Sequence, residues 1–187
     1  MDSDGNNQKQ LTSSESFATG AVGSSDGKWI VYQALRDGKW GVWKMPSEGG
    51  EATRMMDRQC IAPPISPDGK TVACASPDEK AVFKWQIAIV PFDGGTVTRF
   101  IDLPDLPATA NPQVIAWAPD GRSIAYVDVS GVGQNIFAQP IDGGPRKQLT
   151  NFKTNSIAAF NFTRDGKQLI LGRGPLSQDV VLIKDFR

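Results

Sequence analysis

Apolar residues along this chain come in short runs separated by polar turns, and the same order of runs returns several times. The runs are rich in β-branched and aromatic residues and are too short for typical helices. None of them shows the 3.6-residue period of an amphipathic helix. In the first unit the runs fall at 20–22, 29–32, 41–45 and 52–55. The pattern predicts an all-β chain with under about 5% helix, against a usual share near one third.

Two turn signals alternate between the runs. The first is an Asp-Gly turn, whose Asp residues are 42, 52 and 45 positions apart in the copies Ser24–Lys28, Ser66–Lys70, Ala118–Arg122 and Thr163–Lys167. The second is a Gly-Gly pair at 49–50, 94–95 and 143–144. Gly readily takes a turn position with φ > 0, and Asp fits the position before it. Each signal therefore predicts a tight hairpin between neighbouring strands.

Four short strands in each unit of about 45 residues are the pattern of a β-propeller. The turn Ser66–Lys70, followed by an apolar strand, resembles the TolB-like, WD-like propeller repeat, and the likeness covers nearly the whole chain. The tract 179–187 is similar to the end of large bacterial proteins in which such a propeller follows a kinase or DNA-binding domain. The resemblance implies an all-β propeller of four-stranded antiparallel blades, about four per chain. We expect repeats at about 12–56, 57–101, 102–150 and 151–187, in one propeller domain or propeller fragment over 1–187.

The two ends of the chain complement each other in strand count. Residues 8–12 have the composition of the outer strand at 147–150, whereas 159–186 supply three strands with no outer strand after them. Because a bare strand edge favours aggregation, we expect 8–12 to pair with the strand at 179–186. Three arrangements stay open: a small ring closed within one chain, a larger ring shared by two chains through strand exchange, and a piece of a longer propeller. The tight curvature of four blades favours the shared ring over the small one.

Composition removes most familiar enzyme mechanisms. The 187 residues include 20 Lys+Arg and 20 Asp+Glu, so the chain lacks the net positive charge typical of nucleic-acid binders. Histidine is absent, which excludes Ser-His-Asp and Cys-His pairs and His-ligated metals from this chain. Cys60 and Cys74 lack zinc or redox spacing, and we expect two buried free thiols on one sheet face. No cofactor or metal site is expected. Membrane insertion is not expected either, since no apolar run reaches the length of a membrane span.

Loops on the face opposite the Asp-Gly turns are the expected binding surface, because repeat arrays usually bind through the loops of one face. The candidate binding residues are Arg36, Asp37, Arg58, Asn111, Lys153 and Arg173, within a wider set that adds Asp57, Asp78, Glu79, Lys80, Gln134, Thr154 and Asn155. Arg36 and Arg173 are the leading candidates, because we expect each to follow the second strand of its blade at matching positions. The resemblance also implies a recurrent Arg at this position. The alternative for each is an ordinary solvated loop residue.

Two other sets of residues have structural explanations. The four turn aspartates, Asp26, Asp68, Asp120 and Asp165, are explained by turn chemistry rather than by acid–base catalysis. The tryptophans Trp29, Trp40, Trp43, Trp85 and Trp117 are expected to pack between blades, with Trp40 the most exposed.

These observations favour a non-enzymatic scaffold that recognises a protein or peptide through the loops on the face opposite the Asp-Gly turns, which we call the top face. The alternative is a sensor or gating propeller domain of a larger enzyme, such as a bacterial serine/threonine kinase or serine peptidase. The expected partners are a protein or peptide ligand and a second copy of the chain that shares strands, with no nucleic acid. Resemblance implies a periplasmic or other extracytoplasmic location.

Overall fold

The computed structural model describes residues 4–12, 17–60, 63–79, 81, 84–103, 115–163 and 165–175. Within these ranges the chain forms antiparallel β-strands, and none of the residues is helical. The prediction of an all-β chain is confirmed. No helix in these ranges could therefore cross a membrane.

The first sheet has the complete set of four strands in chain order. It consists of β1 (Phe17–Gly23), β2 (Trp29–Arg36), β3 (Lys39–Pro46) and β4 (Thr53–Met56). β2 and β3 pair over their whole length, from Trp29 opposite Pro46 to Arg36 opposite Lys39. Each strand pairs with the next one along the chain, which is the meander expected for a propeller blade.

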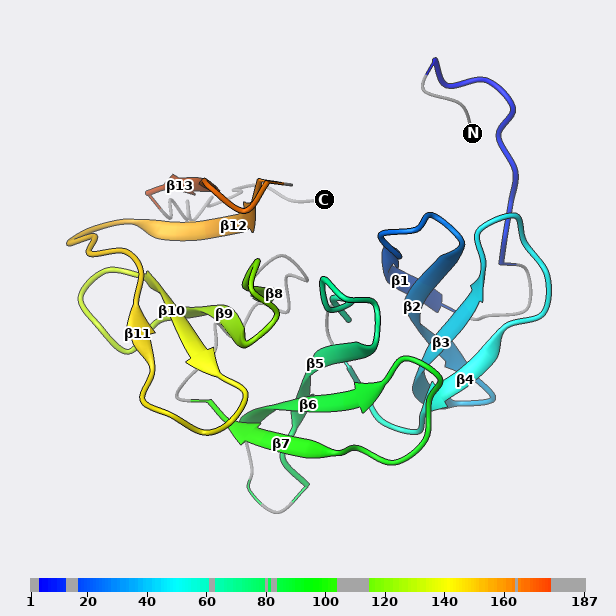
Figure 1. Cartoon of the computed structure of the whole chain (residues 1–187), viewed down its shortest axis with the longest axis horizontal. Helices are drawn as coiled ribbons and strands as arrows, with labels where there is room; N and C mark the ends of the chain where they lie inside the picture. Colours follow the sequence, from blue (N-terminus) through cyan, green and yellow to red (C-terminus); the bar gives the residue numbers. More distant parts are fainter. Residues whose placement is uncertain are drawn as a thin grey trace, which may run out of the picture.

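The other sheets repeat this order with fewer described strands in two of them. They are β5 (Thr71–Pro77), β6 (Trp85–Pro91) and β7 (Arg99–Asp102); β8 (Ile115–Trp117), β9 (Ser123–Asp128), β10 (Asn135–Pro140) and β11 (Lys147–Gln148); and β12 (Ser156–Phe162) with β13 (Leu169–Gly174). A single bridge from Ile65 to Val72 marks the inner strand of the second sheet. Figure 1 shows the four sheets following one another along an arc, with β1–β4 at one end and β12–β13 at the other. The number of complete blades and the repeat boundaries stay predictions.

The Asp-Gly turns have the geometry that the sequence predicts. Gly27, Gly69, Gly121 and Gly166 have φ values of 72°, 71°, 65° and 69°. In the second turn the Gly69 amide donates to the Ser66 carbonyl at 2.8 Å, and the Ser66 hydroxyl donates to Asp68 Oδ1 at 2.6 Å. Turn chemistry thus accounts for the Asp residues as well as the glycines.

Neighbouring turns also contact one another across the blade boundaries. A Cβ added to Gly121 would lie 3.7 Å from Pro67 Cδ, and one added to Gly166 would lie only 2.5 Å from Pro119 Cβ. The proline of one turn therefore packs against the glycine of the next. Gly69 meets nothing within 4 Å, and the turn before it has Ser25 where the second and third turns have Pro67 and Pro119.

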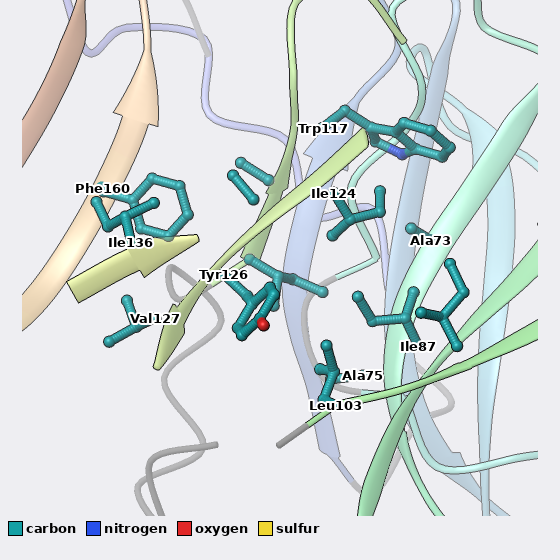
Figure 2. Close-up of a cluster of buried hydrophobic side chains, with 14 of the residues drawn as sticks. Ala73, Ala75, Ile87, Leu103, Trp117, Ile124, Tyr126, Val127, Ile136 and Phe160 are labelled. Atoms are coloured by element: carbon teal, nitrogen blue, oxygen red, sulfur yellow. The ribbon is translucent and has the colours of Figure 1, made fainter. Parts of the chain in front are cut away.

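The hydrophobic core lies between the sheets rather than within any one of them. One cluster joins the second, third and fourth sheets, and Figure 2 shows Tyr126 and Ile124 between Ile87 on one side and Phe160 on the other. A second cluster joins the first two sheets and contains Val31, Val72 and both cysteines. Trp117 belongs to the first cluster, and its indole Nε1 donates to the Pro64 carbonyl at 3.0 Å.

Both cysteines are free and buried, as predicted. Burial and the neighbouring Cys74 raise the pKa of the Cys60 thiol well above its ordinary value. The thiol therefore stays protonated and packs as a small apolar group.

Residues 8–12 form no strand and lie beside the first sheet. Leu11 packs with Tyr32 and Met45, and the Lys9 Nζ donates to the Glu48 carbonyl at 2.5 Å. The proposed pairing partner at 179–186 lies outside the described residues, so this pairing stays a prediction.

Substituting two turn glycines separates backbone strain from packing. Gly69→Ala places a side chain at φ 71° in open space, and we expect a loss of about 1 kcal/mol. Gly166→Ala has the same strain plus the clash with Pro119, and we expect a further loss of about 1–3 kcal/mol. Urea unfolding of the two variants measures this difference. Equal losses would contradict the turn-to-turn contact.

The turn aspartates predict a dependence of stability on pH. Hydrogen bonds from the Ser66 hydroxyl and the Lys70 amide hold the pKa of Asp68 below its ordinary value of 3.8, and Asp26 and Asp165 are held low in the same way. A pKa lowered by folding stabilises the protein above the ordinary pKa, and this stabilisation is lost as the pH falls through the folded-state value.

Thermal unfolding from pH 6 down to about pH 2.5 tests this dependence. Ser66→Ala should lower the melting temperature at pH 6 and flatten its fall with acid, because the carboxylate loses a donor. Ser25→Ala is the matched control, since the hydroxyl that binds Asp26 belongs to Ser24. Identical acid profiles for Ser66→Ala and the parent would contradict this role.

Candidate functional site

Two predicted site residues, Arg36 and Asp37, lie at the hairpin between β2 and β3. Asp37 and Gly38 have φ values of 51° and 73°, which is the two-residue turn that favours Asp-Gly. The Arg36 Nη2 donates to the Tyr32 hydroxyl at 2.7 Å, and its guanidinium lies 3.8 Å from the Trp43 ring centre. Both residues thus have structural contacts that explain their identity.

Arg58 connects the first and second sheets. Its Nη2 donates to the Pro77 carbonyl at 3.2 Å and lies 3.3 Å from Glu79 Oε1. The guanidinium also lies 5.0 Å from the Phe100 ring centre. These contacts make Arg58 a bridge between blades. Asn111, another predicted binding residue, lies outside the described residues.

Arg173 contacts the segment that carries Lys153, at the boundary of the third and fourth sheets. The Arg173 Nη2 donates to the Thr154 carbonyl at 2.7 Å, and its guanidinium lies 4.0 Å from the Phe152 ring centre. The Lys153 Nζ donates to Asn151 Oδ1 at 2.9 Å. Both cationic side chains are exposed, and neither has an acidic partner among the described residues.

The expectation that Arg36 and Arg173 occupy matching positions is wrong. Arg36 is the last residue of β2 and pairs with Lys39, ten positions after the turn residue Asp26. Arg173 lies within β13 opposite Ile157, only eight positions after Asp165. The two arginines therefore do not form one repeated site.

Small-molecule binding pockets have volumes of about 300–1,000 Å³. A pocket of 420 Å³ is lined by Asn155 and Pro175, each two residues along the chain from Lys153 and Arg173 respectively. It lies between the β9–β10 loop and the start of the fourth sheet, and its lining residues are Val129, Gly131, Val132, Gln134, Asn155, Ser156 and Pro175. Val132 at the tip of the loop is 99% exposed. The predicted candidates Gln134 and Asn155 thus belong to the same place as Lys153 and Arg173.

The walls of this pocket are held by backbone contacts. Gln134 Oε1 accepts a hydrogen bond from the Ile157 amide at 2.7 Å. A Cβ added to Gly133 would lie 2.8 Å from the Phe152 carbonyl oxygen, so only glycine lets the two loops approach this closely. These contacts fix the β9–β10 loop to the segment 152–154 and to the start of β12.

A buried ionic network fixes the base of the β9–β10 loop. Asp128 is 3% exposed, accepts hydrogen bonds from the Ser130 amide and hydroxyl, and pairs with Arg146. Arg146 also donates to the Tyr126 hydroxyl at 3.0 Å. Burial alone would raise the pKa of Asp128, but the hydrogen bonds from Ser130 and Arg146 outweigh it and lower the pKa. The carboxylate stays ionised and holds the loop in place.

A second cavity, of 340 Å³, is lined by residues of the inner strands of all four sheets. Its lining is Gly20, Ala21, Val22, Pro64, Ile65, Pro67, Ile115, Ala116, Trp117, Phe160 and Asn161. None of these residues is charged. The sequence predicts strands that lead into each Asp-Gly turn, but it does not predict that they line a cavity, because this depends on how the sheets are arranged around them.

No candidate metal site is found in the described ranges. They hold no group of three or more Cys, Asp or Glu residues that could bind a metal ion. The residues in and near the pocket are two cations, two side-chain amides and one exposed apolar side chain.

Comparison with curated proteins gives relatives of three kinds, although no family model matches the chain. An uncharacterised protein of Agrobacterium fabrum is 30% identical over 134 residues, which covers 68% of this chain and 45% of that protein. The Tricorn protease homolog 1 of Streptomyces coelicolor is 29% identical over 86% of this chain and 14% of its own length. The Tol-Pal system protein TolB of Francisella tularensis is 24% identical over 87% of this chain and 37% of its own length. The chain thus spans less than half the length of each of these relatives.

Solved structures give the same fold. A TolB described from Agrobacterium tumefaciens aligns with a TM-score of 0.69 at 18% identity, covering 88% of this chain and 57% of that one. A puromycin hydrolase aligns with a TM-score of 0.69 at 15% identity, covering 89% of this chain and 27% of that one. The sheets and these likenesses define the chain as a β-propeller. The predicted resemblance to TolB-like propeller repeats is confirmed.

Proposed function

We propose that this chain is a non-enzymatic recognition module that binds an acidic peptide segment of another protein at the top-face pocket between the third and fourth sheets. The observation that carries the proposal is the 420 Å³ pocket lined by Asn155 and Pro175, together with the exposed cations Lys153 and Arg173, which lie two residues before them in the chain. Both cations keep N–H donors for a ligand carboxylate, because each uses only part of its donor set on the protein.

The remaining features of the pocket suit a peptide. Val132 offers an exposed apolar contact between two glycines, and Gln134 and Asn155 add amide groups that can bond to a peptide backbone. Arg173 stacks on Phe152, which reduces the entropy lost when its guanidinium binds a carboxylate. Arg36, Asp37 and Arg58 lie on other blades and are proposed only as outlying contacts of a larger partner.

A second candidate function is a sensor or gating propeller within a larger enzyme. The observation that favours it is the match to the Tricorn protease homolog over 86% of this chain. In that case the catalytic residues belong to another part of the parent protein, since this chain has no histidine. An extracytoplasmic location, by analogy with the Tol-Pal relative, fits either function.

Peptide selection tests the leading proposal. Panning a displayed library of linear peptides on the purified chain should enrich sequences with Asp or Glu beside an apolar residue. A synthetic enriched peptide should bind more weakly as salt rises, because the contact depends on exposed charges. Arg173→Gln and Lys153→Gln should each weaken binding roughly 2- to 5-fold, as expected for one exposed ion pair.

Lys167→Gln is the matched control, because Lys167 is an exposed cation in the Asp-Gly turn at the opposite end of the strands. It should leave peptide affinity unchanged. Enriched peptides without acidic residues, or equal affinity for the parent and Arg173→Gln, would overturn the proposal. Cleavage of the peptide by the chain alone would overturn its non-enzymatic character.

A further inference from the structure

A polar cavity of 340 Å³ lies between the first and second sheets. The first two Asp-Gly turns line it with Ser25, Asp26, Asp68 and Gly69. The cavity is therefore on the face of the Asp-Gly turns, at the opposite end of the strands from the top-face pocket. Its volume suits a small ligand or a single side chain of a partner.

A missing contact between turns leaves room for this cavity. At the two later blade boundaries the proline of one turn packs against the glycine of the next, as Pro67 does against Gly121. At the first boundary Ser25 stands in the place of the proline, and a Cβ added to Gly69 would meet nothing within 4 Å. Ser25 and Gly69 line the cavity instead of closing the boundary.

The side walls of the cavity also differ from those of the next boundary. The rings of Trp29 and Phe92 have centres 6.3 Å apart, and the Lys44 Nζ lies 4.9 Å from the first centre and 4.4 Å from the second. Counted from the turns, the corresponding residues of the second boundary are Thr71, Ile89 and Ile141. The first boundary thus departs from the repeat in the residues that line the cavity.

The cavity has an excess of negative charge. Three carboxylates, those of Asp26, Asp68 and Asp93, line it together with one cation, Lys44. Lys44 is 8% exposed, and its Nζ donates to the Phe92 carbonyl at 3.0 Å and to Asp93 Oδ1 at 3.2 Å. The lysine is therefore already engaged, which leaves the two turn carboxylates without a cationic partner in the cavity.

The two turn carboxylates each keep one oxygen for a ligand. Asp26 and Asp68 accept hydrogen bonds from a turn hydroxyl and a turn amide at Oδ1, and within the described residues neither accepts one at Oδ2. These bonds hold the pKa of both carboxyls below the ordinary value of 3.8, so both are ionised at neutral pH. Lys28 and Lys70 follow the turns and add positive potential, but they do not line the cavity.

We propose that this cavity binds the guanidinium group of an arginine side chain that belongs to a partner protein. A guanidinium has five N–H donors in a planar fork and pairs well with carboxylates. It is weakly hydrated and stacks on aromatic rings, which Trp29 and Phe92 supply. Asp93, whose side chain is 97% exposed, lies where it can contact the segment that carries the arginine. An anion is disfavoured, because the carboxylates outnumber the one lysine.

NMR titration of the isotopically labelled chain tests the proposal. The probe is a blocked five-residue peptide with one arginine between alanines, and its uncharged counterpart has citrulline in place of the arginine. The arginine peptide should shift the amide signals of Asp26 and Gly69 saturably, whereas the citrulline peptide should not. The arginine peptide should also bind more tightly than guanidinium chloride, because a partner segment adds contacts at the rim.

Three variants measure the contributions of charge and space. Asp26→Asn keeps an acceptor oxygen for the turn but removes the charge, and it should weaken binding roughly 2- to 5-fold. Lys44→Met should tighten binding, because it removes a charge of the same sign as the ligand; an anionic ligand would respond in the opposite sense. Ser25→Pro restores the residue of the later turns and should weaken binding by closing the boundary. The same spectra show that each variant keeps the parent fold.

Asp165→Asn is the matched control, because Asp165 accepts the same kinds of turn hydrogen bond and does not line the cavity. It should leave binding unchanged. Equal shifts with the arginine and citrulline peptides would overturn the proposal, as would unchanged affinity in Asp26→Asn or weaker binding by Lys44→Met. Guanidinium chloride that binds as tightly as the peptide would overturn the partner protein as the source. None of these outcomes depends on the top-face pocket, which is proposed to bind a ligand of the opposite charge.

Discussion

The burial of both faces of each sheet against neighbouring sheets is the constraint on which this fold depends. A four-stranded antiparallel sheet forms backbone hydrogen bonds between its neighbouring strands but cannot cover its own side chains. Here the cover comes from the adjacent blades, through one cluster that joins the second to fourth sheets and another that joins the first two. The apolar side chains of the two end sheets of the described arc are therefore the least covered, and the exposure of Ile170 is the clearest example.

The top-face pocket is another product of the same arrangement. It forms at a blade boundary, where the β9–β10 loop meets the loop that leads into the fourth sheet. Its rigidity comes from strand-end contacts, in particular the buried Asp128 with Ser130 and Arg146. A binding surface built this way inherits its precision from the sheets, while the residues at its rim are free to vary.

The fold could be predicted from the sequence because turn chemistry is local. An Asp-Gly pair dictates its own hairpin within a few residues, and the four copies have nearly the same φ at glycine. The site was predicted only in part, because its contacts join residues far apart in the sequence. Asp37 lies in a tight turn, and Arg58 contacts Pro77 and Glu79. Val132 was overlooked as a site residue since one apolar residue between glycines gives no signal until the loop is placed.

The contact between the proline of one Asp-Gly turn and the glycine of the next ties two of the blade boundaries to particular residues in the sequence. Pro67 meets Gly121 and Pro119 meets Gly166, whereas Ser25 leaves Gly69 untouched. Repeats that duplicate or recombine during evolution keep this junction only when both of its halves are inherited together. The second and third turns are thus interchangeable as donors of a junction, and the first is not. A designer who wished to lengthen this arc would copy the unit that starts at Ser66, because it carries both the receiving glycine and the proline that the next blade needs.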